Sequence, residues 1–305
     1  MEWKPKFLER YKGLTDLDAF LACSLTPLRK SIRVNTLKAS VAEIKERLAS
    51  HNLQRVPWCP EGFWLEGQGI GNLPEHFLGY IYLQEAASML PPLALGPQEG
   101  DIVLDMAASP GSKTTQMAAM MKNQGLIVAN DNEMKRLKPL SMNLQRCGVR
   151  NTVLTLMDGR WFKQEFDKVL LDAPCSGTGI IRKSYHTVEE WNPHFVKKLA
   201  GLQKQLLETA FRCVKEGGVV VYSTCSLEPE EDEGVVDFLL QKYDTATVEK
   251  LSLGLTASRP VEEFGKVTYS PEVKKCLRLW PQDHDTEGFF IAKIRKTSGP
   301  DAPPG

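Results

Sequence analysis

The sequence lacks long hydrophobic runs and an N-terminal signal segment. None of its 305 residues lies in a stretch that approaches 18 consecutive apolar residues, which argues against a membrane-spanning helix. The first ten residues, MEWKPKFLER, contain no apolar segment followed by small residues, so a secretory signal is not expected. These absences predict a protein of the cytoplasm that does not associate with a membrane.

Histidine is scarce, and the cysteines show no short regular spacing. There are five histidines and seven cysteines, and neither C-x-x-C nor H-x-E occurs, so we expect no metal site. An odd number of cysteines is typical of free thiols in a reducing compartment. Any cysteine with a function here is therefore expected to act chemically rather than as a cross-link.

The chain has no net charge, because 38 Lys and Arg balance 38 Asp and Glu. The distribution is nevertheless uneven: residues 1–50 carry ten basic and six acidic side chains, whereas residues 228–237 carry six acidic and no basic ones. Phosphate binding depends on Lys and Arg. The asymmetry is compatible with a basic face toward RNA and an acidic far side, or simply with solvated surface charge.

Short, continuously apolar runs alternate with helical segments in the second part of the chain. The runs cover residues 102–104, 126–128, 153–156, 169–171 and 219–222, with a final one at 288–294. Continuous hydrophobicity is typical of strands buried on both faces, and the intervening helices, at 133–147 and 193–214, are what a parallel sheet requires. We predict an α/β domain with a mostly parallel sheet over residues 101–296.

The first 75 residues differ in pattern and predict a small α+β domain. They contain a predicted strand at 31–37, a helix at 41–50 and an irregular strand at 56–65. Residues 76–100 are interpreted as a linker, with a short helix at 84–90 and a loop at 91–100. Residues 297–305 are predicted to form a disordered tail.

The first strand of the α/β domain leads into a loop of small residues. This loop consists of Ala107, Ala108, Ser109, Pro110, Gly111, Ser112 and Lys113. It is not a Walker A loop, because Ser112 separates Gly111 from the lysine and Met106 occupies the place of the first glycine. ATP hydrolysis is therefore not expected, but a turn of this kind brings backbone amides close to a ligand.

Acidic residues follow the ends of successive predicted strands. They are Asp105, Asp131, Asp158 and Asp172. Ligands of open α/β sheets bind beyond the carboxyl ends of the strands, and Asp131, twenty residues after Gly111, is placed to accept the ribose hydroxyls. Asp158 is expected to receive an adenine amino group. Because the loop lacks G-x-G-x-x-G, S-adenosylmethionine is a better candidate than a nicotinamide cofactor.

Two cysteines close the fourth and fifth predicted strands, in the segments DAPC, which ends at Cys175, and STC, which ends at Cys225. In the usual sheet order these ends are neighbours over the cofactor pocket. A thiolate that adds to carbon 6 of a pyrimidine turns carbon 5 into a nucleophile for a methyl group. One cysteine would attack and the other would assist release, while Asp172 holds the cytosine amino group.

Five segments together carry a resemblance to a known family. They are QEAASML, LDMAASPGSKTTQ, FDKVLLDAPCSGTGIIRK, YSTCSLEPEEDE and RLWPQDHDTEGFFIAKIRK. In this order they resemble the Sun/Fmu family of S-adenosylmethionine-dependent RNA cytosine-5 methyltransferases. The similarity is greatest to the bacterial small-subunit rRNA enzymes, which share the serine at 112.

The resemblance implies a Rossmann-like class I methyltransferase domain and assigns roles to individual residues. It implies that Cys225 attacks the base and Cys175 aids release, with Asp172 and Lys113 also in the catalytic set. The cofactor would be held by residues 107–113 and by the side chains of Asp131, Arg136, Asp158 and Asp172.

The expected partner is structured RNA, with rRNA favoured over tRNA, and the chain is expected to act as a monomer. The predicted RNA contacts are Arg29, Lys30, Arg33 and Arg182. The target base must leave its stack to reach a cleft. Trp58, Trp64 and Trp191 could stack on bases, but we expect them in the core.

Two other functions remain open on the sequence alone. One is a methyltransferase that acts on adenine or protein, which would need no thiol at position 225. The other is a non-catalytic RNA-binding assembly factor that retains the methyltransferase fold, which would be expected to have lost a cysteine or a strand-end acid. None of these residues is missing here.

Overall fold

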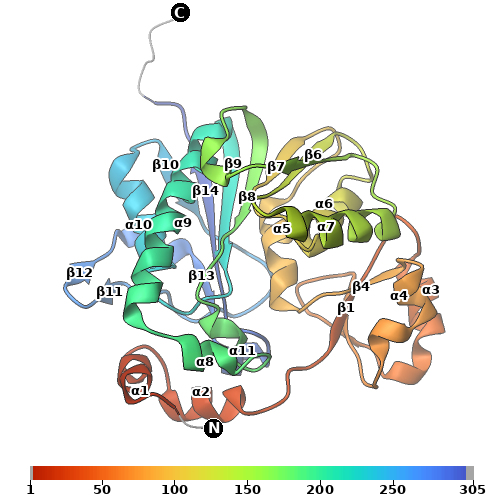
Figure 1. The fold of residues 1–305 in the computed structure, drawn as a ribbon, viewed down its shortest axis with the longest axis horizontal. Helices are drawn as coiled ribbons and strands as arrows, with labels where there is room; N and C mark the ends of the chain where they lie inside the picture. Colours follow the sequence, from red (N-terminus) through yellow and green to blue (C-terminus); the bar gives the residue numbers. More distant parts are fainter. Residues whose placement is uncertain (1–2, 300–305) are drawn as a thin grey trace, which may run out of the picture.

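The computed structural model describes residues 3–299, which form a four-stranded sheet, an eight-stranded sheet and a two-stranded hairpin (Figure 1). The smaller sheet has four antiparallel strands in the order β2-β3-β1-β4. Its strands are β1 Ser31–Val34, β2 Gln54–Arg55, β3 Gly62–Trp64 and β4 Ile81–Leu83.

The larger sheet is mostly parallel and forms the centre of the second domain. Along the sheet the order is β10-β14-β9-β8-β5-β6-β7, and β13 pairs with β14. Strands β9, β8, β5, β6 and β7 run parallel, whereas β14 pairs antiparallel with β9, β10 and β13. The strands are β5 Ile102–Asp105, β6 Leu126–Asp131, β7 Thr152–Leu156, β8 Phe166–Asp172, β9 Val214–Thr224, β10 Ala246–Glu249, β13 Leu277–Leu279 and β14 Phe289–Lys296; β11 Glu263–Phe264 and β12 Val267–Thr268 form a separate hairpin.

Helices surround both sheets. The α-helices are α1 Pro5–Lys12, α2 Leu17–Ser24, α3 Val41–Arg47, α4 Pro74–Phe77, α5 Leu90–Leu95, α6 Ser112–Met120, α7 Met134–Cys147, α8 His186–Glu190, α9 Pro193–Cys213, α10 Glu233–Lys242 and α11 Pro281–His284. The 3-10 turns are η1 Ala49–His51, η2 Ile70–Asn72, η3 Ala87–Met89, η4 Gly159–Trp161, η5 Thr178–Ile180 and η6 Pro271–Lys275. No helix within residues 3–299 is long and apolar enough to cross a membrane.

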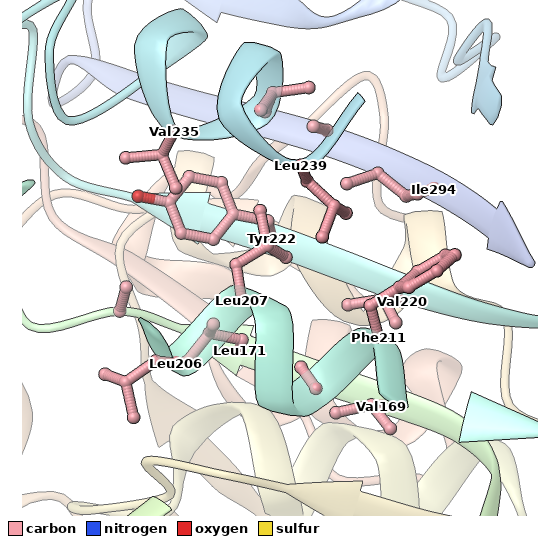
Figure 2. Packing of buried hydrophobic residues seen from close by; sticks show 14 of the residues in the cluster. Val169, Leu171, Leu206, Leu207, Phe211, Val220, Tyr222, Val235, Leu239 and Ile294 are labelled. Atoms are coloured by element: carbon pink, nitrogen blue, oxygen red, sulfur yellow. The ribbon is translucent and has the colours of Figure 1, made fainter. Parts of the chain in front are cut away.

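Alternate residues of the central strands enter two cores on opposite faces of the large sheet. On one face Val169 and Val220 pack against Leu207 and Phe211 of α9 (Figure 2). On the other face Leu170 and its neighbours pack with residues of α5 and α6. Both faces are covered, which explains why these strands are continuously apolar in the sequence. The predicted α/β class with a mostly parallel sheet is confirmed.

The local sequence determines where helix α9 begins. Its first residue is Pro193, and the side chain of Asn192 accepts a hydrogen bond of 2.8 Å from the backbone N–H of Phe195. This cap and the proline at the first helical position define the start of the helix. Phe195 lies in this first turn and is 41% exposed.

The segment that we interpreted as a linker is part of the packed structure. Residues 81–83 form β4, which pairs with β1 in the small sheet. Residues 91–95, expected to be a loop, belong to α5, whose prolines occupy its first turn, where they are tolerated. The predicted helix at 84–90 is instead a 3-10 turn that leads into α5. The small sheet is therefore completed only after residue 75.

Helices α1 and α2 do not pack on the small sheet. Phe7, Tyr11 and Phe20 are buried with Trp191 and Trp280 in a cluster under the large domain. Figure 1 shows α1 and α2 beside α8 and α11, away from α3 and α4. Residues 3–24 thus belong to the same packing unit as the large domain.

The C-terminal end of the described chain is held by a hydrogen bond. The backbone N–H of Thr297 donates to the carbonyl oxygen of Thr245 at 2.8 Å. The rest of the predicted disordered tail, residues 300–305, lies outside the described residues.

Candidate active site

A cavity of about 410 Å³ opens at the carboxyl ends of β5, β8 and β9. It is lined by Tyr82, Leu83, Gln84, Glu85, Ser88, Asp105, Ala107, Ala108, Ser109, Pro110, Ser112, Lys113, Asp172, Ile180, Lys183, Cys225, Glu287 and Phe289. The small-residue loop, the DAPC strand end and the STC strand end therefore meet at one cavity, as predicted for ligands of open α/β sheets.

The two strand-end cysteines lie in direct contact. Strands β8 and β9 are parallel neighbours with Asp172 beside Ser223, and the Sγ atoms of Cys175 and Cys225 lie 3.3 Å apart. Both side chains are half-buried, and Cys225 lines the cavity. The hydrogen bond to Cys225, burial and the charge of Glu231 raise the pKa of Cys175 well above its ordinary value. Cys175 is therefore a thiol at neutral pH.

Lys113 and Asp172 form an ion pair beside the cysteines. The Nζ atom of Lys113 lies 2.6 Å from Oδ2 of Asp172 and donates a hydrogen bond of 3.1 Å to Ser88 Oγ. The hydroxyl of Ser223 donates to the other oxygen of Asp172 at 2.8 Å. Burial alone would lower the pKa of Lys113, but the attraction of Asp172 outweighs it and the pKa is raised. The lysine remains a cation that orients the carboxylate at the cavity wall.

Asp105 is a buried acid behind this pair. Its Oδ2 accepts a hydrogen bond of 2.7 Å from the hydroxyl of Thr114 in α6. Burial raises the pKa of Asp105 to about 7, although the bond from Thr114 and the charge of Lys113 oppose the shift. Asp105 thus ties the end of β5 to the helix that follows the small-residue loop.

The small-residue loop leads into α6 through Gly111, which has a φ of +102°. A Cβ at this position would lie 3.0 Å from Cδ1 of Leu140 in α7, so a side chain would be both strained and crowded. Gly111 therefore allows the loop to pass tightly against α7. The other residues of 107–113 line the cavity.

Asp131, at the end of β6, has an oxygen without a hydrogen-bond donor among the described residues. Its side chain is 2% exposed, and Oδ2 accepts no hydrogen bond, although Nε of Arg136 forms an ion pair with it at 3.2 Å. A buried carboxylate oxygen in this state is suited to accept a ligand hydroxyl. With the small-residue loop, this chemistry fits the ribose of a nucleoside such as that of S-adenosylmethionine.

Asp158 is engaged within the protein. It caps η4 by accepting from the N–H of Arg160 at 2.9 Å, and it pairs with the guanidinium of the same residue at 2.6 Å. The hydrogen bond from Arg160 lowers the pKa of Asp158. Asp158 does not line the cavity described above, so its predicted contact with adenine stays a prediction.

The sequence reasoning did not assign a role to two acids that line the cavity. Glu85 accepts hydrogen bonds from the backbone N–H groups of Ser88, at 3.1 Å, and Glu287, at 3.2 Å. Burial, followed by the charge of Glu287, raises the pKa of Glu85 to about 8. Burial also raises the pKa of Glu287. Their signal was present, because both lie within segments that carry the family resemblance.

Arg33 is not placed to contact RNA. It is 2% exposed, and its guanidinium donates to the carbonyl oxygen of Ser112 at 2.8 Å and to the hydroxyl of Thr115 at 2.8 Å. Gln84 and Gln116 accept further bonds from it. The expectation of a phosphate contact is wrong for this structure, because Arg33 joins the small sheet to α6.

Arg182 is also turned inward. Its side chain is 1% exposed, pairs with Asp285 at 2.6 Å and donates to the carbonyl oxygens of Pro27 and Thr286. The next residue, Lys183, lines the cavity instead, and its side chain is 68% exposed. Arg182 therefore holds the N-terminal segment to the loop before β14.

Arg29 and Lys30 remain near the surface. The guanidinium carbon of Arg29 lies 3.8 Å from the ring centroid of Trp64, and its Nε pairs with Asp285 at 2.7 Å. Lys30 is exposed and donates to the carbonyl oxygen of Gly67. Both can still reach a phosphate, so their role in RNA binding stays a prediction.

The acidic run at 228–237 is largely buried. It is therefore neither an acidic surface opposite an RNA-binding face nor solvated surface charge, the two alternatives that the sequence suggested. Glu228, Asp232 and Glu233 have no exposed surface. The guanidinium of Arg278 lies 2.8 Å from Asp232 and 2.6 Å from Glu233. Burial raises the pKa of Asp232 well above its ordinary value. The run supports the loop after β9 instead of facing solvent.

Comparisons with known proteins agree with this site. The description "16S rRNA methyltransferase RsmB/F" matches residues 92–295, and "N-terminal domain of 16S rRNA methyltransferase RsmF" matches residues 4–86. The chain is 49% identical to the tRNA (cytosine(49)-C(5))-methyltransferase of Pyrococcus abyssi, over 95% of this chain and 96% of that protein. It is 47% identical to the ribosomal RNA small subunit methyltransferase F of Vibrio cholerae over 95% of this chain, which spans 62% of that relative.

Solved structures show the same fold. A methyltransferase homologue from Pyrococcus horikoshii superposes with a TM-score of 0.83 at 39% identity, covering 96% of this chain and 99% of that one. NSun6 from Pyrococcus horikoshii superposes with a TM-score of 0.86 at 26% identity, covering 97% of this chain and 99% of that one.

Proposed function

The chain belongs to the RsmB/F family of RNA methyltransferases, and from this premise we propose that it transfers a methyl group from S-adenosylmethionine to carbon 5 of a cytosine in structured RNA. The observation that carries the proposal is that Cys225 lines a cavity shared with the small-residue loop and that its sulfur lies 3.3 Å from the sulfur of Cys175. Methylation of an amino group needs no thiol, whereas methylation of pyrimidine carbon 5 requires a nucleophile at carbon 6.

In this proposal Cys225 is the nucleophile. Its thiolate forms a bond to carbon 6, and the electron pair displaced from the 5,6 double bond makes carbon 5 nucleophilic. Asp172, held by Lys113 and Ser223, accepts a hydrogen bond from the cytosine amino group and orients the ring beside Cys225. The arrangement requires the base to leave its stack and enter the cavity.

Release reverses the covalent bond. The proton on carbon 5 passes to solvent water, the electron pair of that C–H bond re-forms the 5,6 double bond, and the bond from carbon 6 to the sulfur of Cys225 breaks with its electrons on sulfur. We assign assistance in this step to Cys175, whose thiol can donate its proton to the departing sulfur because the two sulfur atoms are in contact. The pKa of Cys175, raised by its bond to Cys225 and by burial, keeps it protonated and non-nucleophilic while Cys225 attacks.

The cofactor, when bound, supplies the methyl group as a sulfonium. We propose that residues 107–113 hold it through backbone amides and that Oδ2 of Asp131, which accepts no hydrogen bond from the described residues, accepts one from a ribose hydroxyl. Arg136 orients Asp131 through their ion pair at 3.2 Å. Asp158, at the end of the neighbouring strand β7, is proposed to contact the adenine.

The proposed substrates are RNAs of the kinds that its relatives modify, rRNA or tRNA. The relatives in Pyrococcus abyssi and Vibrio cholerae are named for these two classes. The seven free cysteines among the described residues support action in the reducing environment of the cytoplasm.

Two cysteine variants test the proposal. Purified protein is incubated with S-adenosylmethionine and total RNA, and 5-methylcytosine is mapped by bisulfite sequencing. We expect C225A to give no 5-methylcytosine above background. C175A should retain attack but accumulate a protein–RNA adduct that survives denaturing electrophoresis. C23A, at a cysteine that does not line the cavity, is the control, and normal methylation by C225A would refute the assignment.

A further inference from the structure

Each catalytic cysteine is followed by a serine, and the two serines contact each other. Ser176 follows Cys175 and Ser226 follows Cys225, and their Oγ atoms lie 3.2 Å apart. The two sulfur atoms are themselves 3.3 Å apart. The two loops are therefore in contact at two points, between the sulfur atoms of the cysteines and between the hydroxyl groups of the serines that follow them.

A single buried carboxylate holds this junction. Glu231 has no exposed surface. Both of its carboxylate oxygens lie 3.1 Å from the backbone nitrogen of Ser176, and Oε2 accepts a bond of 2.6 Å from the hydroxyl of Ser176. The hydrogen bonds that fix Ser176 also fix the peptide that precedes it, which carries the carbonyl group of Cys175.

We infer that Glu231 is the positioning residue that holds the Cys175 loop against Cys225, so that the second thiol is in place when the methylated base is released. The inference rests on the proposed function and adds a role for a residue that contacts neither base nor cofactor.

The charge of Glu231 also acts on Cys175. After the hydrogen bond to Cys225 and burial, the nearby charges of Cys225 and Glu231 raise the pKa of Cys175. Burial raises the pKa of Glu231 itself to about 7, while the bonds from Ser176 and Ser226 oppose the shift and the charge of Glu228 adds to it. A neutral side chain at position 231 should therefore lower the pKa of Cys175.

The first measurement needs no RNA. The pKa of Cys175 is obtained from the pH dependence of its alkylation by iodoacetamide, followed by peptide mass spectrometry, in C225A and in C225A/E231Q. We expect the half-maximal rate to move to lower pH by about one unit, a tenfold change in acidity. The matched control is E230Q, because Glu230 is the adjacent acid, pairs with Arg10 and does not contact Ser176. An unchanged pKa in C225A/E231Q would overturn the inference.

The second measurement follows the adduct with RNA. We expect E231Q to form the adduct but to resolve it about tenfold more slowly than wild type, whereas E230Q behaves as wild type. S176A, which removes the 2.6 Å hydroxyl bond and keeps the backbone one, should slow resolution to a smaller extent and remains informative if E231Q does not fold. If folded E231Q and folded S176A both resolve the protein–RNA adduct at the wild-type rate, Glu231 has no positioning role.

The two proposals fail separately. If wild type gives no 5-methylcytosine and C175A no adduct, the proposed function fails even where the alkylation result stands. If the adduct forms and resolves normally in E231Q, only the role of Glu231 is lost.

Discussion

The guanidinium of Arg33, in the small sheet, donates a hydrogen bond of 2.8 Å to the carbonyl oxygen of Ser112, in the first turn of α6. This bond connects the N-terminal sheet to the loop that we propose to hold the cofactor. Tyr82 of β4 lines the same cavity. The small domain therefore forms part of the wall of the active site as well as a separate surface.

Replacement of Arg33 by methionine should reduce stability without changing the electrostatic part of RNA binding. Loss of its buried bonds to Ser112 and Thr115 is expected to cost about 3 kcal/mol, measured by urea unfolding. The slope of RNA affinity against salt concentration should be the same as in wild type.

The control for Arg33 is K30M, at an exposed lysine three residues away in the sequence. We expect K30M to unfold like wild type. If R33M were as stable as K30M but had a shallower salt slope, Arg33 would be a phosphate contact after all.

Asp131 is expected to be needed for cofactor affinity. A hydrogen bond to a charged group contributes about 1.5–3 kcal/mol, so D131A should weaken binding of S-adenosylmethionine by roughly ten- to a hundredfold, measured by calorimetry. The neighbouring Glu133, which pairs with Lys135 at 2.9 Å, gives the control E133Q. Equal affinities for D131A and E133Q would remove the ribose role.

Asp105 should make stability depend on pH in a defined direction. Its pKa is raised by burial from 3.8 to about 7, so the folded protein binds this proton more tightly than the unfolded chain does. The contribution of Asp105 to the free energy of unfolding therefore falls as pH rises from about 4 to about 7, and it stays low above pH 7.

The variant D105N removes this dependence. Since one pKa unit corresponds to about 1.4 kcal/mol, we expect D105N to gain up to about 4 kcal/mol over wild type between pH 5 and pH 9 in urea unfolding. The exposed Asp244 supplies the control D244N. A difference between D105N and wild type that does not grow with pH would contradict the assignment.

Arg278 is expected to be a main determinant of stability. It is fully buried and pairs with Asp232 and Glu233, so R278M would leave two buried acids without a cation. Removing one partner of a buried ion pair costs about 3–5 kcal/mol. K274M, which breaks the exposed pair of Lys274 with Glu262, should cost less than about 1 kcal/mol. Similar unfolding midpoints for the two variants would show that the buried network is dispensable.

The central strands were predictable because a strand that is buried on both faces of a sheet consists of consecutive apolar residues. Residues 103–104 and 169–171 are buried on both sides of the sheet, so an unbroken apolar run specifies them. Residues at the carboxyl ends of such strands line one cavity, which is why the strand pattern could predict that Cys225, Asp172 and the loop at 107–113 lie together. Short strands such as β10 and β13 were missed because three or four residues give too weak a periodic signal.

The interior charges were not predictable in the same way. Whether an acid is exposed or buried depends on its partner, and Glu233 meets Arg278 across 45 residues of sequence. Arg33 likewise finds Ser112 79 residues away. A local charge count treats all of these side chains as surface, so it misplaced the acidic run and assigned Arg33 to RNA.

Helix α1 and the loop after Cys225 share one carboxylate. The hydroxyl of Tyr11 and the indole nitrogen of Trp191 each donate to Oε1 of Glu228 at 2.8 Å, and Arg10 pairs with its other oxygen at 2.6 Å. A shortened protein that begins at the large domain would lack Arg10 and Tyr11, two of these three partners of Glu228. It would also expose the remaining aromatic residues of the cluster to solvent. Dissection of this enzyme into halves should therefore yield an insoluble catalytic fragment, and the two halves will have to be produced together.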